Sequence, residues 1–356
     1  GLASGVEILR LGACRLCLVQ VEGMRGYPAS CSLPVREGLV VTTDSPEIRR
    51  LRRGVLELIL TEHPTSCLSC GHSEDCDEVR PEPERAGRTT GCHSCPAMNR
   101  CELRTLAGAF GLLVPPVPVR YRGLEVRSSD PFMDHDLNLC ILCGRCVRTC
   151  EGIHGRPAIA HLHRGGRTLV GQAFGQSLIE SGCRFCGACV DACPVGALTE
   201  RASKWSGEPD EKCETTCLFC DEGCRLSVEA RDGQVLSVHP ARAGQALCVL
   251  GRFALPEFLR APGRLSAPLV RGEGALRRAS WDEALERASF LLKPHQGRAF
   301  ALVHDRTSTL ADRRMFRLFC RKVMGGGLLI ETRPGPGGRS RTTLPLSVKA
   351  VLSAGD

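Results

Sequence analysis

The sequence predicts an α+β protein built from several small domains that metal centres, rather than one large apolar core, hold together. Three observations predict this class. The chain of 356 residues contains 23 cysteines, and aromatic residues make up only 4% of it, so cross-links must replace part of a core. Most cysteines stand in C-x2-C runs. Strand-like and helix-like patterns alternate towards the C-terminus. The length allows two or three ordinary domains.

The cysteine pattern favours metal ligands over disulfides. The runs are too close in sequence for a spread disulfide framework, the total is odd, and no secretory leader is visible. Such cysteine usage is typical of a reducing compartment, so we expect a cytoplasmic protein. No stretch of 18 apolar residues occurs, so we expect no membrane span and at most peripheral association through partners.

The formal net charge of +8 invites comparison with nucleic-acid binding proteins, as do the arginines of residues 49–53 and 313–314. That charge counts every thiol as neutral. A [4Fe–4S] core held by four thiolates carries roughly −2, so a few clusters would cancel most of the excess. We therefore expect no nucleic-acid partner.

The strongest signal is a doubled motif in the middle of the chain. The spacing C-x2-C-x2-C-x3-C occurs twice, and the second copy ends in Cys-Pro. Three closely spaced thiolates can hold three corners of a [4Fe–4S] cluster, while the fourth cysteine leaves on a helix and reaches the neighbouring cluster. The motif therefore predicts a bacterial-type ferredoxin domain with two clusters. Their ligand sets are Cys140, Cys143, Cys146 and Cys193, and Cys183, Cys186, Cys189 and Cys150. Zinc fits less well, because zinc sites favour two separated C-x2-C pairs.

A third cysteine group stands near the start of the chain. Cys14 and Cys17 form a C-x2-C pair, and Cys31 follows. This is the tail of a plant-type [2Fe–2S] loop, in which a first cysteine precedes the pair. Residues 1–13 contain no cysteine.

Three segments here carry a family resemblance. GACRLCLVQVEG, PASCSLPVREGLVVTTDSPEIRRLRRGVLELIL and HPTSC resemble the N-terminal region of the large iron–sulfur subunit of respiratory complex I. Similar modules occur in NAD-dependent formate dehydrogenases and NAD-reducing hydrogenases. The resemblance implies a β-grasp [2Fe–2S] domain whose missing ligand lies upstream of Cys14, so we expect the N-terminus to be incomplete.

A helix should lead from this domain to a histidine. Ser45 and Pro46 predict the helix start, and apolar residues keep helical spacing up to Ile59. Pro64 is expected to end the helix beside His63. A lone histidine is more often a surface or core residue. The resemblance, however, implies that H-x3-C-x2-C-x5-C holds a [4Fe–4S] cluster with one imidazole ligand, which raises its potential. The implied ligands are His63, Cys67, Cys70 and Cys76.

The C-x2-C-x5-C triplet then occurs a second time, as Cys92, Cys95 and Cys101. Three hypotheses compete for it. It could hold an additional cluster with a fourth ligand such as His93 or His72, hold zinc, or be the true partner of His63. The contiguous spacing favours the first triplet for His63, and an additional metal centre for the second. The following CELRTLAGAFG also resembles the family's continuation.

The last cysteine group is Cys217, Cys220, Cys224 and Cys248. Between its third and fourth members, LSVEARDGQVLSVHP predicts a hairpin about Asp232-Gly233. TTCLFCDEGCRLSV and LCVLGRF resemble the N-terminal cluster domain of molybdopterin oxidoreductases, including formate dehydrogenase, which implies a further [4Fe–4S] cluster. Zinc also suits paired cysteines with a distant fourth.

Residues 262–356 predict a short α/β remnant. A capping box of Ser280 and Glu283 should start a helix to Leu292, followed by a strand at 299–304, a helix at 309–324 and an LLIE strand. Leu250 stands where the molybdopterin family commonly has Lys, and PGPGGRSRTT contains no cysteine. We therefore expect no molybdopterin in this chain.

No dinucleotide motif, Ser/His/Asp set or paired-carboxylate set stands out, so no catalytic residue is predicted. The hypothesis is an electron-transfer subunit of an NAD(P)H-linked oxidoreductase. It would carry one [2Fe–2S] and four [4Fe–4S] clusters, with a fifth at the second triplet. The resemblance implies a flavin-containing NADH-oxidising subunit as one partner and a formate dehydrogenase, hydrogenase or quinone-reductase type subunit as the other. The alternatives are the N-terminal part of a molybdenum-dependent formate dehydrogenase and a zinc-stabilised binding protein. The predicted domain bounds are 1–44, 45–120, 121–205, 206–261 and 262–356.

Overall fold

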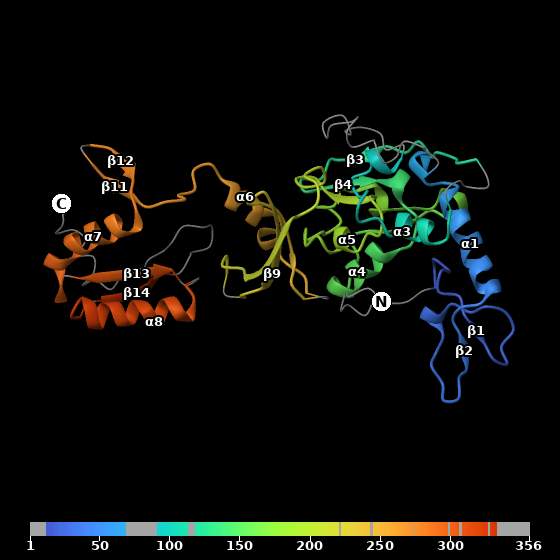
Figure 1. The fold of residues 1–356 in the computed structure, drawn as a ribbon, viewed down its shortest axis with the longest axis horizontal. Coiled ribbons are helices and arrows are strands. Elements are labelled where there is room, and N and C mark those ends of the chain that lie inside the picture. Colours follow the sequence, from blue (N-terminus) through green and yellow to red (C-terminus); the bar gives the residue numbers. More distant parts are fainter. Residues whose placement is uncertain are drawn as a thin grey trace. The chain divides into compact units, whose positions relative to one another are not determined.

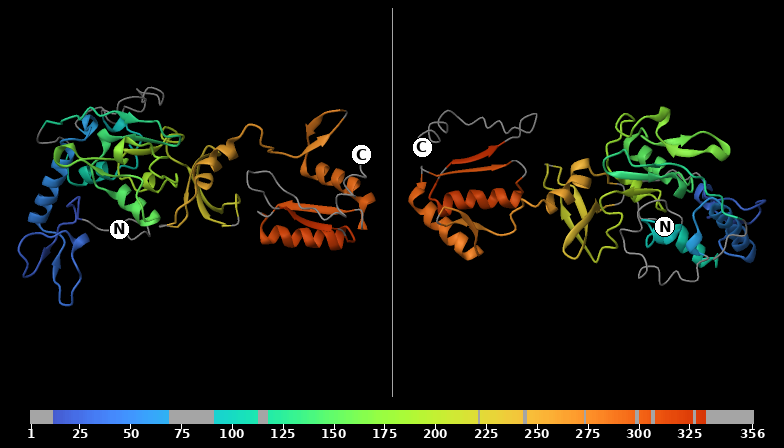
Figure 2. Two further views of the ribbon diagram at one scale, coloured as in Figure 1. Left: turned by 180° about the vertical axis from the view of Figure 1, so that it is seen from behind. Right: turned by 90° about the horizontal axis from the view of Figure 1, so that it is seen from above.

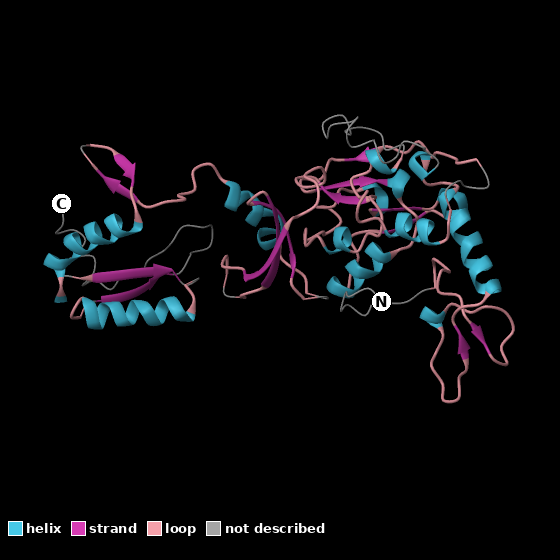
Figure 3. Ribbon diagram, viewed as in Figure 1, coloured by secondary structure: helices cyan, strands magenta, loops and turns pink. Residues whose placement is uncertain are grey.

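The computed structural model describes residues 12–68, 91–112, 118–220, 222–242, 245–272, 274–297, 300–305, 308–326 and 328–332. The chain divides into two compact units. One comprises residues 1–215 and 225–257, and the other comprises residues 216–224 and 258–356. Figure 3 shows helices, strands and loops in both units.

The N-terminal part of the first unit contains a small antiparallel sheet of β1 (Gln20–Val21) and β2 (Val41–Thr42). A bridge joins Leu18 to Ala29, and the next turn, Ser30–Ser32, carries Cys31. The β-grasp topology stays a prediction, because the described residues contain only these two strands of the expected domain.

Helix α1 (Pro46–Leu60) begins as the sequence predicts: the Ser45 hydroxyl accepts a hydrogen bond from the Ile48 amide at 3.2 Å, and Pro46 occupies the first turn. It ends at Leu60, four residues before Pro64, so the prediction that Pro64 terminates it is wrong. Leu60 packs in one core with helix α3 (Glu102–Ala109), Leu139 and Val195. This core joins the His63 region to the ferredoxin region.

The ferredoxin region contains two sheets and two helices. The sheets are β3 (Val126–Arg127), β4 (Met133–Asp136) and β7 (Leu198–Glu200) in the order β3-β4-β7, and the hairpin β5 (Ala160–Leu162) with β6 (Leu169–Gly171). The helices are α4 (Arg145–His154) and α5 (Ala188–Asp191), which lie beside each other in Figure 1. Figure 2 shows this green part of the chain from two further sides. Each helix follows the C-x2-C of one copy of the doubled motif.

A further antiparallel sheet of three strands follows the ferredoxin region. Its strands are β8 (Glu211–Thr216), β9 (Arg225–Arg231) and β10 (Gln234–Pro240), in the order β10-β9-β8. Asp232 and Gly233 both have positive φ, 51° and 72°, which is the geometry of a type I′ turn. The predicted hairpin is therefore confirmed. A π-helical turn at Leu250–Ala254 leads into α6 (Leu255–Arg260).

The second unit contains an α/β layer. Its elements are the hairpin β11 (Leu269–Arg271) and β12 (Leu276–Arg278), α7 (Trp281–Leu292), β13 (Ala301–Asp305), α8 (Leu310–Leu318) and β14 (Leu328–Thr332). Strands β13 and β14 pair in parallel, and α8 connects them along one face (Figure 1). A π-helical turn at Phe319–Val323 extends α8 and buries Cys320. The predicted order of elements is correct.

The helix starts in this unit differ in one detail from the prediction. The Ser280 hydroxyl accepts from the Glu283 amide at 3.2 Å, but the Glu283 carboxylate pairs with Arg277. The reciprocal half of the predicted capping box is thus replaced by an ion pair. Thr309 and Asp312 form a complete box at the start of α8. Among the described residues, no helix has both the length and the apolar character needed to cross a membrane.

Candidate metal centres

The first ferredoxin site gathers cysteines from both copies of the motif. Cys140, Cys143, Cys146 and Cys193 line one small cavity, together with the apolar Val195 and Leu198. Burial raises the pKa of Cys140 to about 11 and also raises the pKa of Cys143 and Cys146, and the nearby Cys193 contributes to each increase. Buried thiols with raised pKa values stay protonated unless a metal takes the proton's place.

The second ferredoxin site has the reciprocal arrangement. Burial raises the pKa of Cys183, Cys186 and Cys189, and the charge of Cys150 contributes to all three increases. Cys150 lies in α4 of the first motif copy. The fourth cysteine of each copy therefore lies near the first three cysteines of the other copy.

A glycine follows the second cysteine of each copy and permits the close turn. Gly144 and Gly187 have φ values of 68° and 73°, a region in which side chains are strained. A Cβ on Gly187 would lie 2.5 Å from Nε of Arg252. These glycines thus bring α4 and α5 to the cysteine clusters.

Several sulfur atoms accept hydrogen bonds from backbone amides. The Ala158 amide donates to Sγ of Cys150, and the Phe185 amide donates to Sγ of Cys183, both at 3.4 Å. Nε2 of His154 also lies 3.4 Å from Sγ of Cys186. Hydrogen bonds to sulfur are one means by which proteins set cluster potentials.

The N-terminal cysteines lie near one another. The Ser30 amide donates to the Cys17 carbonyl at 2.9 Å, which holds the Cys31 turn beside the C-x2-C pair. Burial raises the pKa of Cys31, and the neighbouring Cys17 and Cys14 raise it further. The structure therefore brings together all three cysteines predicted for the [2Fe–2S] site.

The histidine site differs from the expected arrangement. His63 is buried, and Cys67 lies beside the second triplet: Sγ of Cys67 accepts the His93 amide at 3.4 Å. Burial raises the pKa of Cys92 to about 11, and the nearby Cys67 and Cys101 contribute to this increase. Burial raises the pKa of Cys95 to about 12, and Cys101 contributes. Cys70, Cys76 and His72 lie outside the described residues.

The last group is divided between the two units. Cys217, Cys220 and Cys224 belong to the second unit, where the Cys217 amide donates to the Cys224 carbonyl at 2.8 Å. Cys248 belongs to the first unit. The expected four-cysteine set therefore stays a prediction.

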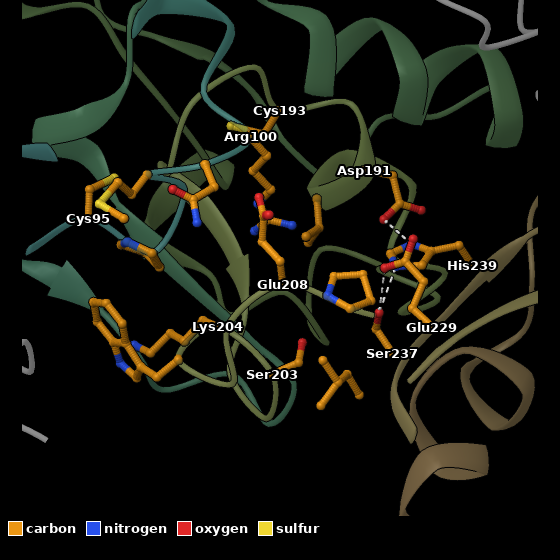
Figure 4. A pocket seen from close by; sticks show the side chains of 18 of the residues that line it. Cys95, Arg100, Asp191, Cys193, Ser203, Lys204, Glu208, Glu229, Ser237 and His239 are labelled. Atoms are coloured by element: carbon orange, nitrogen blue, oxygen red, sulfur yellow. Dashed lines mark hydrogen bonds and ion pairs between the residues drawn. The ribbon is translucent and has the colours of Figure 1, made fainter. Parts of the chain in front are cut away.

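A charged cluster that sequence reasoning missed lies next to the second ferredoxin site. Figure 4 shows His239 between Asp191 and Glu229 at the edge of a cavity of about 530 Å³ that also reaches Cys95 and Cys193. Nδ1 of His239 lies 3.0 Å from Asp191, and Nε2 lies 3.4 Å from Glu229. The fully buried Arg252 pairs with Asp191 at 3.1 Å and with Glu200 at 2.7 Å. The only signal in the sequence was the position of Asp191 between Cys189 and Cys193.

The donor sets fit iron–sulfur clusters. The cysteines of the first ferredoxin site line a shared cavity, and amides donate to sulfur in both motif copies and at the second triplet. Within the described part of the chain, no three His, Cys, Asp or Glu side chains have the arrangement of a site for one metal ion.

Family models match four segments of the chain. NADH-quinone oxidoreductase subunit 3, ferredoxin-like domain, matches residues 130–199, and the molybdopterin oxidoreductase Fe4S4 domain matches 210–257. The 2Fe-2S iron-sulfur cluster binding domain matches 7–46, and the NADH-ubiquinone oxidoreductase-G iron-sulfur binding region matches 52–77. The chain is therefore similar to the complex I-type family of iron–sulfur large subunits. Its cofactors are a [2Fe–2S] cluster and [4Fe–4S] clusters, as these domains indicate.

Relatives with curated names are similar to much of this chain. NADPH-Fe(3+) oxidoreductase subunit alpha of Geobacter sulfurreducens is 31% identical over 326 residues, which are 89% of this chain and 35% of the relative. NADH-quinone oxidoreductase subunit 3 of Thermus thermophilus is 30% identical over 345 residues, which are 83% of this chain and 40% of the relative. NADP-reducing hydrogenase subunit HndD of Solidesulfovibrio fructosivorans is 33% identical over 200 residues, which are 55% of this chain and 29% of the relative. The chain thus spans about a third of the length of these relatives.

Proposed function

We propose that this chain relays single electrons along a series of iron–sulfur clusters within an NAD(P)H-linked oxidoreductase. The observation that carries the proposal is the exchange of fourth cysteines in the ferredoxin region, where Cys193 lies near Cys140 and Cys143, and Cys150 lies near Cys183 and Cys186. Two clusters built this way share both helices and lie close together, which suits transfer between them. The clusters supply the redox change.

The proposed ligands follow the cysteine groups. Cys14, Cys17 and Cys31 would hold the [2Fe–2S] cluster together with a residue preceding Cys14. The ferredoxin clusters would take the exchanged sets, and a further [4Fe–4S] cluster would take Cys217, Cys220, Cys224 and Cys248. The five predicted domains, including a β-grasp domain at 1–44, are part of this proposal.

The protein's own role is to hold each sulfur in place and to set its surroundings. Amides donate to sulfur at Cys150 and Cys183, and burial shields Cys146 from water. Both features influence how readily a cluster accepts an electron. The positive charge of Arg145 acts on Cys143 and favours its thiolate.

Partners follow from the relatives. The Geobacter and Thermus relatives are named as subunits of NADPH- and NADH-linked oxidoreductases, and the Solidesulfovibrio relative as a subunit of an NADP-reducing hydrogenase. We infer a flavin-containing NAD(P)H-oxidising subunit at one end of the relay and a hydrogenase, formate dehydrogenase or quinone-reductase type subunit at the other. The reducing cytoplasm suits a chain with so many thiols.

The test is a redox titration of anaerobically purified protein followed by EPR. Successive reduction should reveal one [2Fe–2S] signal and several [4Fe–4S] signals that interact magnetically. Adding NAD(P)H together with a flavin-containing partner subunit should reduce them, whereas NAD(P)H alone should not. A protein that contains zinc in place of iron would contradict the relay and support a zinc-stabilised binding protein.

One observation favours a second candidate. Residues 210–257 match the molybdopterin oxidoreductase Fe4S4 domain, which suits the front part of a molybdenum-dependent formate dehydrogenase. In that case the relay would end at a molybdenum centre outside residues 1–356. Stoichiometric molybdenum in the complete gene product, with formate-dependent cluster reduction, would establish this candidate. Its absence would leave the relay with another electron partner.

A further inference from the structure

Two cysteine triplets compete for the site beside His63. The family model for 52–77 ends at Cys76 and Asp77 and so includes the first triplet. The described residues place the second triplet near Cys67, the first member of the first triplet. The question is which triplet supplies the ligands.

The contact between Cys67 and the second triplet is close. A Cβ on Gly91 would lie 2.5 Å from Sγ of Cys67 and 3.1 Å from its backbone nitrogen. Only glycine leaves room at that distance, since real Cβ atoms do not approach so closely. The backbone amide of His93 donates to the same sulfur at 3.4 Å. The turn Cys92–Ser94 is therefore fitted against the turn Ser66–Leu68.

The other two cysteines of the second triplet face the core that carries α1. Cys101 caps α3, and its sulfur accepts the Arg104 amide at 3.4 Å. Cys95 packs against the same core, and a Cβ on Gly196 would lie 2.7 Å from its sulfur. Both sulfurs are thus fixed by neighbouring elements and largely shielded from water, as cluster ligands are.

His63 is a further buried donor on the same segment as Cys67. Its ring makes a hydrogen bond with the Leu139 backbone, and Leu139 lies in the core that contains Cys101. Nδ1 is buried and has no hydrogen-bond partner among the described residues. A buried polar atom without a partner is costly, and coordination to a metal would satisfy it.

We propose that a single [4Fe–4S] cluster is held between the second triplet, Cys92, Cys95 and Cys101, and the His63–Cys67 segment, and that Cys70 and Cys76 are not its ligands. The inference rests on the proposed relay, which it deepens by assigning one of its centres. It replaces the expectation that the contiguous first triplet binds with His63. The fourth corner goes to His63 or Cys67, the two donors of that segment.

Paired variants of the holoprotein test this assignment. Cys95→Ser/Cys101→Ser should lose about four iron atoms per chain and one EPR signal, because two of the cluster's ligands are gone. The matched control Cys70→Ser/Cys76→Ser should retain both. The double variant His63→Ala/Cys67→Ser should behave like the first pair. In every variant, unchanged signals from the two ferredoxin clusters show that the chain has folded.

A second measurement needs no substitution. Removal of iron by a chelator should accelerate alkylation of Cys92, Cys95 and Cys101, followed by mass spectrometry, and should leave the rate at Cys70 and Cys76 unchanged. The proposal is overturned if Cys70→Ser/Cys76→Ser loses the signal, if His63→Ala/Cys67→Ser keeps it, or if iron protects Cys70 and Cys76. Failure of the relay itself looks different, because the unmodified protein would then contain no iron at any site.

Discussion

Nε2 of His154, at the end of α4, lies 3.4 Å from Sγ of Cys186 in the other copy of the doubled motif. A cluster-bound thiolate can only accept a hydrogen bond, so the imidazole would donate to it. This contact joins a side chain of one motif copy to the cluster site of the other. It is a direct means of adjusting one of the two ferredoxin centres.

Replacing His154 with Leu should therefore lower the reduction potential of one ferredoxin cluster and leave the other unchanged. The hydrogen bond withdraws electron density from sulfur and favours the reduced cluster, so its loss favours the oxidised form. Potentiometric EPR titration measures the shift. His163→Asn is the control, because His163 is exposed and has a positive φ that Asn tolerates. Equal potentials in wild type and His154→Leu would refute this role.

The exchange of fourth ligands predicts matched losses among single variants. Cys150→Ser should lose the same EPR signal as Cys183→Ser, although the two positions lie in different motif copies. Cys193→Ser should instead match Cys140→Ser. If Cys150→Ser matched Cys140→Ser, each motif copy would hold its own cluster, and the exchanged arrangement would be wrong.

The buried ion pair of Arg252 should contribute strongly to stability. Arg252 is fully buried and its guanidinium lies 2.7 Å from Glu200. Arg252→Met leaves that buried carboxylate without a partner, which costs about 3–5 kcal/mol of unfolding free energy. Anaerobic thermal unfolding followed by circular dichroism should show a clear fall in the midpoint. Arg50→Gln removes an exposed pair with Glu47 and should not change it. A wild-type midpoint in Arg252→Met would contradict the prediction.

His239 predicts a specific pH dependence. Burial alone would lower its pKa, but hydrogen bonds to Asp191 and Glu229 outweigh burial and raise it from 6.5 to about 9. Because the folded pKa lies above the ordinary value, the protonated imidazole stabilises the fold fully below about pH 6.5. This stabilisation is lost as pH rises through about 9.

The measurement is the thermal unfolding midpoint between about pH 6 and about pH 10, a range that brackets both pKa values of the histidine. Relative to His239→Gln, the wild type should have a higher midpoint at the acidic end, and the difference should shrink towards the alkaline end. Glu229 has the opposite pH dependence. Hydrogen bonding to His239 lowers the pKa of Glu229 to about 2, so the stabilisation from its carboxylate is lost only in strong acid. A constant difference between the two proteins across the range would rule out the titration of His239.

Local patterns predicted much of the fold. Asp232 and Gly233 both take the positive φ that the hairpin demands, and Ser45 and Ser280 cap the helices that follow them. These features depend on a few neighbouring residues, so the sequence contains the information directly. The doubled cysteine spacing likewise indicated which thiols lie together.

Long-range choices could not be predicted in the same way. Two cysteine triplets of identical spacing compete for the site beside His63. Because the entropy cost of closing a loop grows slowly with its length, spacing alone does not decide which triplet lies beside His63. The outcome depends on Gly91 fitting against Cys67 and on Cys101 joining the core of α1. The burial of Arg252 between Asp191 and Glu200 likewise depends on tertiary contacts that no local pattern reveals.

The metal content of anaerobically purified protein tests the central claim most directly. The account predicts iron and acid-labile sulfide in equal amounts, little zinc, and EPR signals of both [2Fe–2S] and [4Fe–4S] clusters after reduction. A protein that is free of iron yet folded, with the circular dichroism and thermal stability of the purified complex, would contradict it.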